Sequence, residues 1–370
     1  MATIFYTMSG YGKGHAGRAR SVLQTLTEHR FIVLCAGDSF DYLAPLYRDD
    51  PRVQVLRFEP HLRFVLNNGK VNRLATAGSA MGYLLRFRPT IRSMCRLIET
   101  HHPDVALTDV DPVLPRAARR CGVPFITLDS HGMFTCCEMR GLPLPMRGHA
   151  FLVRLYVRFC HARGAARHLV STFADLPIKP AYADKAGMVG AVLRPELMDR
   201  TVTDDRFLVA YVRSDVGTPA LLETLDSCGL PVHVYAMGER PDAGRLRFLP
   251  IGEGFMRDLR ACTAIVTMAG NQLIAEAFYL GKPVLAFPMP GQIEQMLNGY
   301  YIRASGGGEC VERDDLTPSV LADFLSKRER YAAAIARMPL FDRPGNERIA
   351  AAIDEVCGAR APRLAESVPV

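Results

Sequence analysis

The sequence predicts an α/β protein with two Rossmann-like, doubly wound domains that face a central cleft. Short apolar runs alternate with longer helical patterns, and the alternation pauses near residue 190 and restarts after residue 205. A chain of 370 residues is long enough for two cores of ordinary size. We expect residues 1–190 to form the first domain, 191–205 a linker, 206–357 the second domain and 358–370 a loose tail.

Each expected element rests on one of two patterns. Uninterrupted apolar runs indicate buried parallel strands at residues 3–8, 31–36, 53–58, 105–108 and 123–128, and later at 207–212, 232–237, 264–268 and 284–287. Apolar residues at helical spacing indicate helices at 19–28, 81–100, 114–120, 219–228, 255–262 and 271–280. This order is typical of parallel sheets covered by helices on both faces.

Charge and cysteine usage narrow the class of protein. Residues 1–200 hold 27 Lys and Arg against 16 Asp and Glu, a net charge of +11, whereas residues 201–370 carry −4. A basic half suits a phosphate-bearing substrate or an anionic membrane face, and solvated Arg-rich faces explain it equally well. The ten cysteines form no CxxC pair, residues 1–8 lack a signal-peptide pattern, and no apolar run is long enough to span a membrane. We expect a cytoplasmic protein, with a peripheral place at the inner membrane face left open.

The most informative stretch begins where the strand at 264–268 ends. Ala269 and Gly270 form a tight turn, and a helix begins at Asn271 and Gln272. The free amides and positive dipole end of such a helix form a site for a diphosphate. Glu276 lies one turn further, on a face that we expect to reach outward, where a carboxylate accepts hydrogen bonds from a ribose diol.

The loop at residues 288–295 follows the next strand and brings three polar side chains near the same helix start. These are Gln292, Glu294 and Gln295, and amides and carboxylates suit the hydroxyls of a sugar. Each feature alone is common as a turn or a helix cap. Their ordered combination is much less common.

This combination resembles the GT-B glycosyltransferases, especially MurG-like and related inverting enzymes. The matching elements are Ala269-Gly270, Asn271-Gln272, Glu276-Ala277, Gly281-Lys282-Pro283, Pro288, Glu294-Gln295 and Asn298. The resemblance implies that Gly270, Asn271 and Gln272 hold the donor diphosphate, Glu276 the ribose, and Glu294 and Gln295 the donor sugar. It further implies that Leu249 lies against the base and that Arg213 and Ser214 contact phosphate. Many relatives have His or Ser where this chain has Ala269.

A glycine-rich loop follows the first strand. Its segment Gly12–Gly17 has the GxGxxG spelling, and Asp38 lies where a ribose-binding acid would, so a dinucleotide site is an alternative. The resemblance instead places Gly12 and Gly14 on the acceptor side and makes His15 the base that deprotonates the acceptor hydroxyl. A helix-capping or acceptor-phosphate role for His15 stays open.

A carboxylate at a neighbouring strand end can orient such a histidine. Asp109 ends the strand at 105–108 and is the first choice, with a turn-forming role as the alternative. Ser130 and His131 follow the next strand and are expected to line the acceptor pocket. We expect no metal ligands at this site.

Residues 145–168 combine basic and apolar side chains. Arg147, Arg154 and Arg158 accompany apolar residues at 151, 152, 155, 156 and 159, which share one helical face. Such a helix can lie on an anionic membrane or hold a lipid-phosphate acceptor, and an ordinary Arg-rich surface helix shows the same pattern.

The resemblance implies an inverting, metal-independent transferase that moves a sugar from a nucleoside diphosphate, with UDP favoured as the carrier, to an acceptor hydroxyl. The nucleotide-sugar is a co-substrate, so no cofactor is expected, and no nucleic-acid motif is present. A lipid-linked, polysaccharide or small-metabolite acceptor fits equally. A nucleotide-sugar epimerase of the same fold and an NAD-dependent oxidoreductase are the alternatives.

Overall fold

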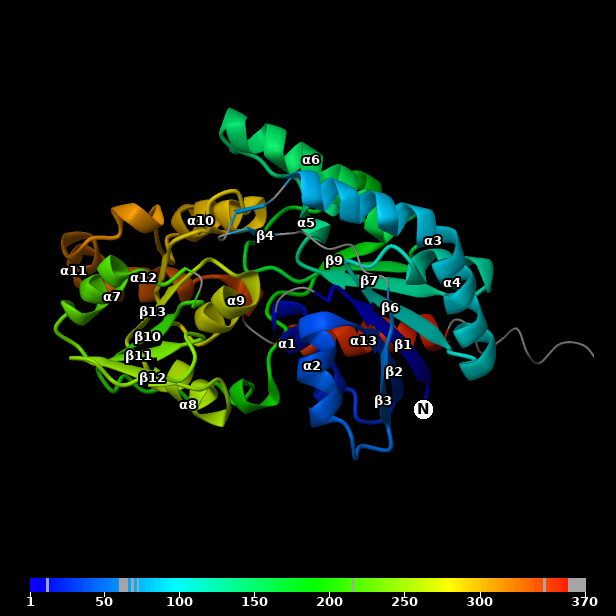
Figure 1. Cartoon of the computed structure of the whole chain (residues 1–370), viewed down its shortest axis with the longest axis horizontal. Coiled ribbons are helices and arrows are strands. Elements are labelled where there is room, and N and C mark those ends of the chain that lie inside the picture. Colours follow the sequence, from blue (N-terminus) through cyan, green and yellow to red (C-terminus); the bar gives the residue numbers. More distant parts are fainter. Residues whose placement is uncertain are drawn as a thin grey trace, which may run out of the picture.

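The computed structural model describes residues 1–10, 13–59, 66–67, 70–71, 73–214, 216–341 and 344–358. These residues form two lobes, each built on a parallel sheet with helices on both faces (Figure 1). The predicted α/β class with two Rossmann-like domains is confirmed. Within the described ranges, no helix is long and apolar enough to cross a membrane.

The first sheet has the strand order β3-β2-β1-β6-β7-β8-β9, and all its neighbours are parallel. Its strands are β1 (Thr3–Met8), β2 (Arg30–Cys35), β3 (Val53–Arg57), β6 (Val105–Asp109), β7 (Phe125–Asp129), β8 (Arg167–Val170) and β9 (Ala186–Met188). Met8 pairs with Asp109, so the loop after β1 and the end of β6 meet at the same sheet edge. A short antiparallel pair, β4 (Leu66–Asn67) and β5 (Lys70–Val71), stands apart.

Helices cover both faces of this sheet. One face packs against α1 (Lys13–Thr25), α2 (Gly37–Leu46) and the last helix, α13 (Gly345–Gly358). The other face packs against α3 (Arg73–His101) and α4 (Leu114–Arg120). Two further helices, α5 (Gly132–Cys136) and α6 (Leu144–His161), lie between β7 and β8 in the chain. The residues of α13 belong to the range 206–357, yet they pack against the first sheet.

The second sheet has the order β12-β11-β10-β13-β14-β15, again parallel. Its strands are β10 (Leu208–Tyr211), β11 (Val232–Tyr235), β12 (Leu246–Leu249), β13 (Ala264–Thr267), β14 (Val284–Ala286) and β15 (Gly308–Cys310). One face packs against α7 (Pro219–Asp226), α11 (Pro318–Ser326) and α12 (Arg328–Ile335). The other packs against α8 (Glu253–Ala261), α9 (Asn271–Tyr279) and α10 (Ile293–Ser305).

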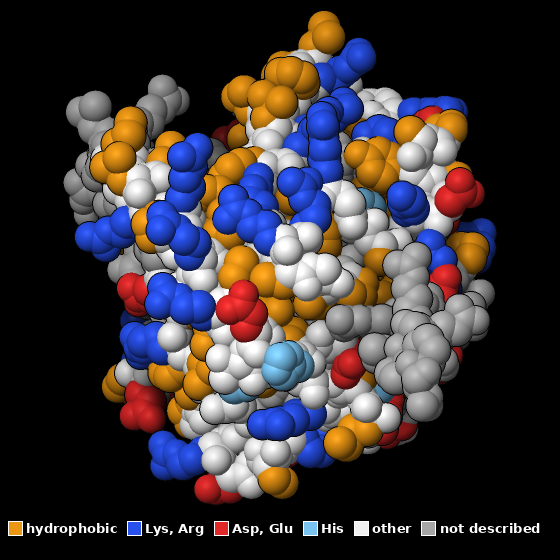
Figure 2. Space-filling view, turned by 90° about the vertical axis from the view of Figure 1, so that its right-hand side faces the viewer, with side chains coloured by type: hydrophobic (Ala, Val, Ile, Leu, Met, Phe, Trp, Pro, Cys, Tyr) orange, Lys and Arg blue, Asp and Glu red, His pale blue; other side chains and the backbone are white. Residues whose placement is uncertain are grey.

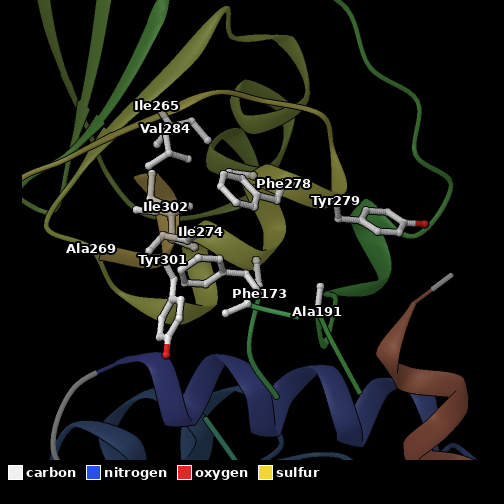
Figure 3. Close-up of a cluster of buried hydrophobic side chains, with 14 of the residues drawn as sticks. Phe173, Ala191, Ile265, Ala269, Ile274, Phe278, Tyr279, Val284, Tyr301 and Ile302 are labelled. Atoms are coloured by element: carbon white, nitrogen blue, oxygen red, sulfur yellow. The ribbon is translucent and has the colours of Figure 1, made fainter. Parts of the chain in front are cut away.

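One apolar core joins the two lobes. It contains Phe173 and Ala191 from the first half of the chain together with Ile274, Phe278 and Tyr301 from the second (Figure 3). The Phe173 and Phe278 rings meet edge to face with their centroids 5.4 Å apart. The lobes therefore share buried side chains, and the segment after β8 is packed against α9.

The helix expected at residues 19–28 begins earlier, at Lys13, and ends at Thr25. Two glycines, Gly14 and Gly17, lie inside it and weaken the helical pattern that a reader of the sequence sees. Its buried stripe, Ala16, Ala19, Val22 and Leu23, packs on the first sheet and holds the helix in place. The predicted glycine-rich loop is thus largely the first turns of α1.

Candidate functional site

His15 and Asp109 lie together, as the sequence predicts. His15 is in the first turns of α1, and its Nδ1 is 2.9 Å from Oδ1 of Asp109, the last residue of β6. Arg18, one turn further along α1, donates from Nε to Oδ2 of the same carboxylate at 2.9 Å. Asp109 is fully buried, whereas His15 keeps 17% of its side chain exposed. The imidazole is therefore held at Nδ1, while part of its side chain stays exposed.

The charge of Asp109 is stabilised inside the protein. Burial acts to raise the pKa of this carboxyl, but Arg18 and then His15 outweigh burial and hold the pKa below its ordinary value. Asp109 is thus a carboxylate at neutral pH. A carboxylate on Nδ1 keeps the proton there and leaves Nε2 of His15 free to accept one.

Ser130 and His131 follow β7 and reach the second lobe. Ser130 Oγ donates to Oε1 of Glu294 at 2.9 Å, and His131 Nε2 is 3.4 Å from Oε2 of the same residue. The His131 ring also stacks on His15, with 6.4 Å between ring centroids. The predicted acceptor-side residues, the predicted base and a predicted sugar-binding carboxylate therefore form one cluster across the two lobes.

The turn before α9 consists of a residue with a left-handed backbone conformation followed by a glycine. Ala269 adopts a left-handed φ of 62°, and its carbonyl accepts a hydrogen bond from the buried Asn298 Nδ2 at 2.9 Å. Gly270 is exposed and has open space where a Cβ would point. Asn271 donates from Nδ2 to the Ser171 carbonyl at 2.9 Å. The start of the predicted diphosphate helix therefore combines an open glycine with side chains tied to the first half of the chain.

Glu276 lies elsewhere than expected. It does not face outward: its side chain is fully buried, and Arg194 donates Nε to Oε1 at 3.0 Å and Nη2 to Oε2 at 2.6 Å. Gln272 Nε2 adds a bond to Oε1 at 3.0 Å. The reason is the lobe contact, which buries this face of α9 and brings the linker arginine onto it. The ribose role of Glu276 stays a prediction.

The remaining predicted residues lie around the ends of the second sheet. Leu249 ends β12 and is half-buried, Arg213 is two residues beyond β10 and half-buried, and Ser214 is exposed. Gln292 precedes α10, and Gln295 accepts the Met289 backbone N–H at 2.8 Å. Gly14 is exposed in α1, and Gly12 lies outside the described residues.

Two arginines of this site, Arg18 and Arg194, were not predicted from the sequence. Arg18 lies three residues after His15, so the helical period alone could have placed both side chains on one face. Arg194 is a single charge between the apolar run 191–193 and Pro195, which is a weak signal because any linker carries charges. Among the described residues, no group of three His, Cys, Asp or Glu is arranged to hold a metal ion.

Two doubly wound lobes, with a His–Asp pair on one and a glycine-turn helix on the other, define a GT-B glycosyltransferase. The sequence pattern of glycosyl transferase family 1 matches residues 2–328, and the chain belongs to that family. Membership of this family favours a transferase over the nicotinamide oxidoreductase and epimerase alternatives.

Sequence relatives carry the name UDP-N-acetylglucosamine–N-acetylmuramyl-(pentapeptide) pyrophosphoryl-undecaprenol N-acetylglucosamine transferase. The one from Polaromonas naphthalenivorans is 39% identical over 179 residues, which are 41% of this chain and 50% of the relative. The one from Rhodopseudomonas palustris BisB18 is 26% identical over 274 residues, 67% of this chain and 70% of the relative. The chain spans about half the length of the first of these relatives.

Solved structures share the fold over nearly the whole chain. The calicheamicin glycosyltransferase CalG4 has a TM-score of 0.65 and 16% identity, covering 98% of this chain and 100% of that one. Phytolacca americana UGT2, complexed with UDP-2fluoro-glucose and pterostilbene, has a TM-score of 0.69 and 13% identity, covering 97% and 99%. At these identities the likeness concerns the fold.

Proposed function

We propose that the protein is an inverting, metal-independent glycosyltransferase that uses a UDP-sugar and takes His15 as its base. The observation that carries this proposal is the His15–Asp109 pair, which holds Nδ1 of the imidazole and leaves the side chain 17% exposed. The His15 ring stacks on His131, whose Nε2 contacts Glu294 of the second lobe. The acceptor oxygen bonds to the anomeric carbon while the bond from that carbon to the diphosphate oxygen breaks. The hydroxyl proton passes to Nε2 of His15, and UDP leaves with the bonding electrons.

The leaving diphosphate needs positive partners. The backbone amides at the start of α9 include those of Gly270 and Asn271. Arg213 supplies a guanidinium near the end of β10. These groups can take the part that a divalent cation plays in other transferases, which supports metal independence. Glu294 and Gln295 would hold the donor sugar.

The test compares the native protein with His15→Gln, each with a panel of UDP-sugars. UDP-N-acetylglucosamine is the first donor to try, because the relatives' name includes it. We expect His15→Gln to lower kcat by about 10²–10⁴ without changing UDP affinity, as for loss of a general base. We expect the protein to stay active in the presence of a chelator. NMR of the product should show inversion of the configuration at the anomeric carbon. Unchanged turnover in His15→Gln, or loss of turnover with chelator, would contradict the proposal.

We also propose that the protein works in the cytoplasm and docks on the anionic inner face of a membrane. Two neighbouring helices support this. On α6, Phe151, Leu152 and Leu155 are 56%, 61% and 50% exposed, and on α3, Leu84 and Leu85 are 53% and 76% exposed. Phe87 of α3 and Phe159 of α6 pack against each other, with 5.4 Å between their ring centroids.

Exposed basic side chains lie on the same two helices as this apolar surface. Arg86 and Arg88 on α3 and Arg147 and Arg158 on α6 are exposed. Hydrophobic groups among Lys and Arg are visible at the top of the face in Figure 2. Apolar side chains that enter the headgroup region and arginines that pair with anionic lipid are the two contributions to interfacial binding. A lipid-linked acceptor would fit this position, and a soluble acceptor is the other outcome of the acceptor screen.

Vesicle flotation tests the membrane proposal. The native protein is expected to float with vesicles that contain phosphatidylglycerol and to stay behind with phosphatidylcholine alone. Replacing Leu85 and Leu152 with Ser should abolish flotation. Leu46→Ser is the matched control, because Leu46 is 52% exposed and α2 packs on the face of the first sheet opposite α3. Equal flotation of both variants would overturn the proposal.

A further inference from the structure

We propose that Asn346, at the start of the last helix, is a positioning residue that fixes the linker between the helix of His15 and the helix of Glu276. This inference rests on the proposed function, because it assigns the residue a part in the same reaction. Asn346 lies beyond residues 2–328, which match the family pattern. The residue is the second of α13, and only 1% of it is exposed.

The Asn346 amide holds both backbone groups of one linker residue. Leu193 N–H donates to Oδ1 of Asn346 at 2.8 Å, and Nδ2 of Asn346 donates to the Leu193 carbonyl at 2.9 Å. The second hydrogen on Nδ2 reaches Oγ1 of Thr25, the last residue of α1, at 2.7 Å. One buried side chain thus connects the linker, the last helix and the end of the helix that contains His15.

The residues around Asn346 reinforce this contact. Gly345 N–H donates to the Ala191 carbonyl at 2.8 Å, and Arg348 Nη1 donates to the Val189 carbonyl at 3.3 Å. A Cβ on Gly345 would lie 2.2 Å from the Val189 carbonyl oxygen, so the backbones approach as closely as only glycine allows. The start of α13 therefore contacts residues 189–193, which include the beginning of the linker.

Helix α9 also forms hydrogen bonds with this segment. Gln272 Nε2 on α9 donates to the Val192 carbonyl at 2.7 Å. Arg194, next to Leu193, makes its two bonds to the buried Glu276. Gln272 and Glu276 are the residues predicted to meet the donor diphosphate and ribose. The linker segment that Asn346 holds is thus bonded to two residues of α9, Gln272 and Glu276.

The position of Asn346 has a consequence for the reaction. The helix α13 shares its buried residues with the core of the first sheet, so it moves with α1 and His15. Helices α1 and α9 are also in direct contact. A change in linker position therefore changes the spacing between His15 and a donor bound on α9. A misplacement of about 1 Å can lower the rate of a well-oriented reaction by about 10²-fold.

The test compares Asn346→Ala with Thr224→Val. Thr224 is also buried, and its Oγ1 donates to the Leu316 carbonyl at 3.3 Å within the second lobe, away from the linker. Both changes should lower the thermal midpoint. Asn346→Ala alone should lower kcat by about tenfold or more, with UDP affinity within about threefold of the native value. Its Leu193 amide should also exchange hydrogen faster.

Two results would overturn the inference: equal kcat in the two variants after correction for folded fraction, or a Leu193 amide as protected in Asn346→Ala as in the native protein. Should Asn346→Ala fail to fold, Thr25→Val removes one of the three bonds and decides the matter by the same comparison of kcat. A native protein without transferase activity would instead refute the proposed function. The exchange of the Leu193 amide would still decide whether Asn346 fixes the linker.

Discussion

One buried carboxylate, Asp109, neutralises the buried Arg18 and orients His15. The change Asp109→Asn keeps the size of the side chain and removes its charge. We expect the free energy of unfolding to fall by about 3–5 kcal/mol, because Arg18 is left as an uncompensated buried charge. We also expect kcat to fall by about 10²–10⁴, because the imidazole loses the carboxylate that orients it. Urea unfolding and steady-state kinetics measure the two effects.

The control for this prediction is Asp41→Asn. Asp41 is 69% exposed and pairs with Arg57 at 3.3 Å, and exposed pairs of this kind contribute about 0–1 kcal/mol. Equal stability losses in the two variants would show that the Arg18 charge is compensated by another group or by water.

A second residue links stability to pH. Burial, aided by nearby His161, lowers the pKa of His168 to about 4, and its Nδ1 is 2.9 Å from Thr127 Oγ1. The unfolded chain takes up this proton near pH 6.5, so it binds more protons than the folded protein between about pH 6.5 and 4. Folding stability therefore falls as the pH drops through this window, by about 3 kcal/mol at most.

The change His168→Gln should remove this part of the acid sensitivity, as measured by urea unfolding at pH 7, 5.5 and 4.5. His149→Gln, at an exposed position on α6, is the control and should follow the native protein. A native-like pH dependence in His168→Gln would assign the effect to other groups.

At the residue scale, the sequence could predict the contact of His15 with Asp109, but not the partner of every site residue. Asp109 was foreseeable because parallel strands end at one sheet edge, and the pairing of Met8 with Asp109 places the carboxylate beside the loop that leads to His15. The bonds of Glu276 to Arg194 were not foreseeable, because they depend on how two lobes pack. Sequence patterns record the face that a helix buries, not the residue from a distant segment that meets it.

At the scale of single elements, two of the edge strands, β15 of the second sheet and β9 of the first, can be compared through one glycine in each. Gly308 begins β15, and a Cβ there would lie 1.9 Å from the Val284 carbonyl oxygen of β14. Gly187 lies within β9, and a Cβ there would meet nothing within 4 Å. We expect Gly308→Ala to lower the free energy of unfolding by about 1–3 kcal/mol, because the strands must move apart. Gly187→Ala should stay within about 1 kcal/mol of the native value. Thermal unfolding of both variants checks this, and similar midpoints would contradict it.

Helices show the same division between what the sequence reveals and what it hides. The pattern at residues 145–168 predicts the amphipathic α6, which spans Leu144–His161. The structure buries Ala150, Val157 and Cys160 and leaves Phe151 and Leu152 exposed. Periodicity identifies an apolar stripe without telling whether protein or solvent covers it. The exposed leucines of α3 join this surface only because α3 and α6 lie side by side (Figure 1).

At the scale of the whole molecule, the two-domain prediction understated how far the lobes depend on each other. The break in the strand-helix rhythm near residue 190 does separate two sheets. The last helix nevertheless returns to the first sheet, and one core contains side chains of both halves. Neither feature has a local sequence signal, since each is a contact between segments more than 80 residues apart. Two residues of the predicted linker, Val192 and Leu193, form hydrogen bonds with α9 and α13.

A shared core predicts that the two lobes unfold in one cooperative transition. Phe173, 1% exposed, comes from the first half of the chain and packs edge to face on Phe278 of α9 (Figure 3). The change Phe173→Ala removes a large side chain from this core and should lower the free energy of unfolding by about 3–5 kcal/mol. Hydrogen exchange should then show amides of both sheets losing protection together, because each lobe loses part of the surface that covers the other.

The comparison that decides this is Phe324→Ala. Phe324 is equally buried but belongs to the core between the second sheet and α11, where it stacks on Tyr331 with ring centroids 5.5 Å apart. We expect Phe324→Ala to lower the free energy of unfolding by a similar amount. Under partly denaturing conditions, amides of the second sheet should lose protection before those of the first. In Phe173→Ala the two sheets should keep a common midpoint in urea when followed by hydrogen exchange. If the two sheets unfold at separate urea midpoints in both the native protein and Phe173→Ala, the apolar contact between the lobes adds little to stability. The positions of His15 and α9 would then be set by the polar contacts of the linker and by those between the lobes, such as Asn271 with the Ser171 carbonyl.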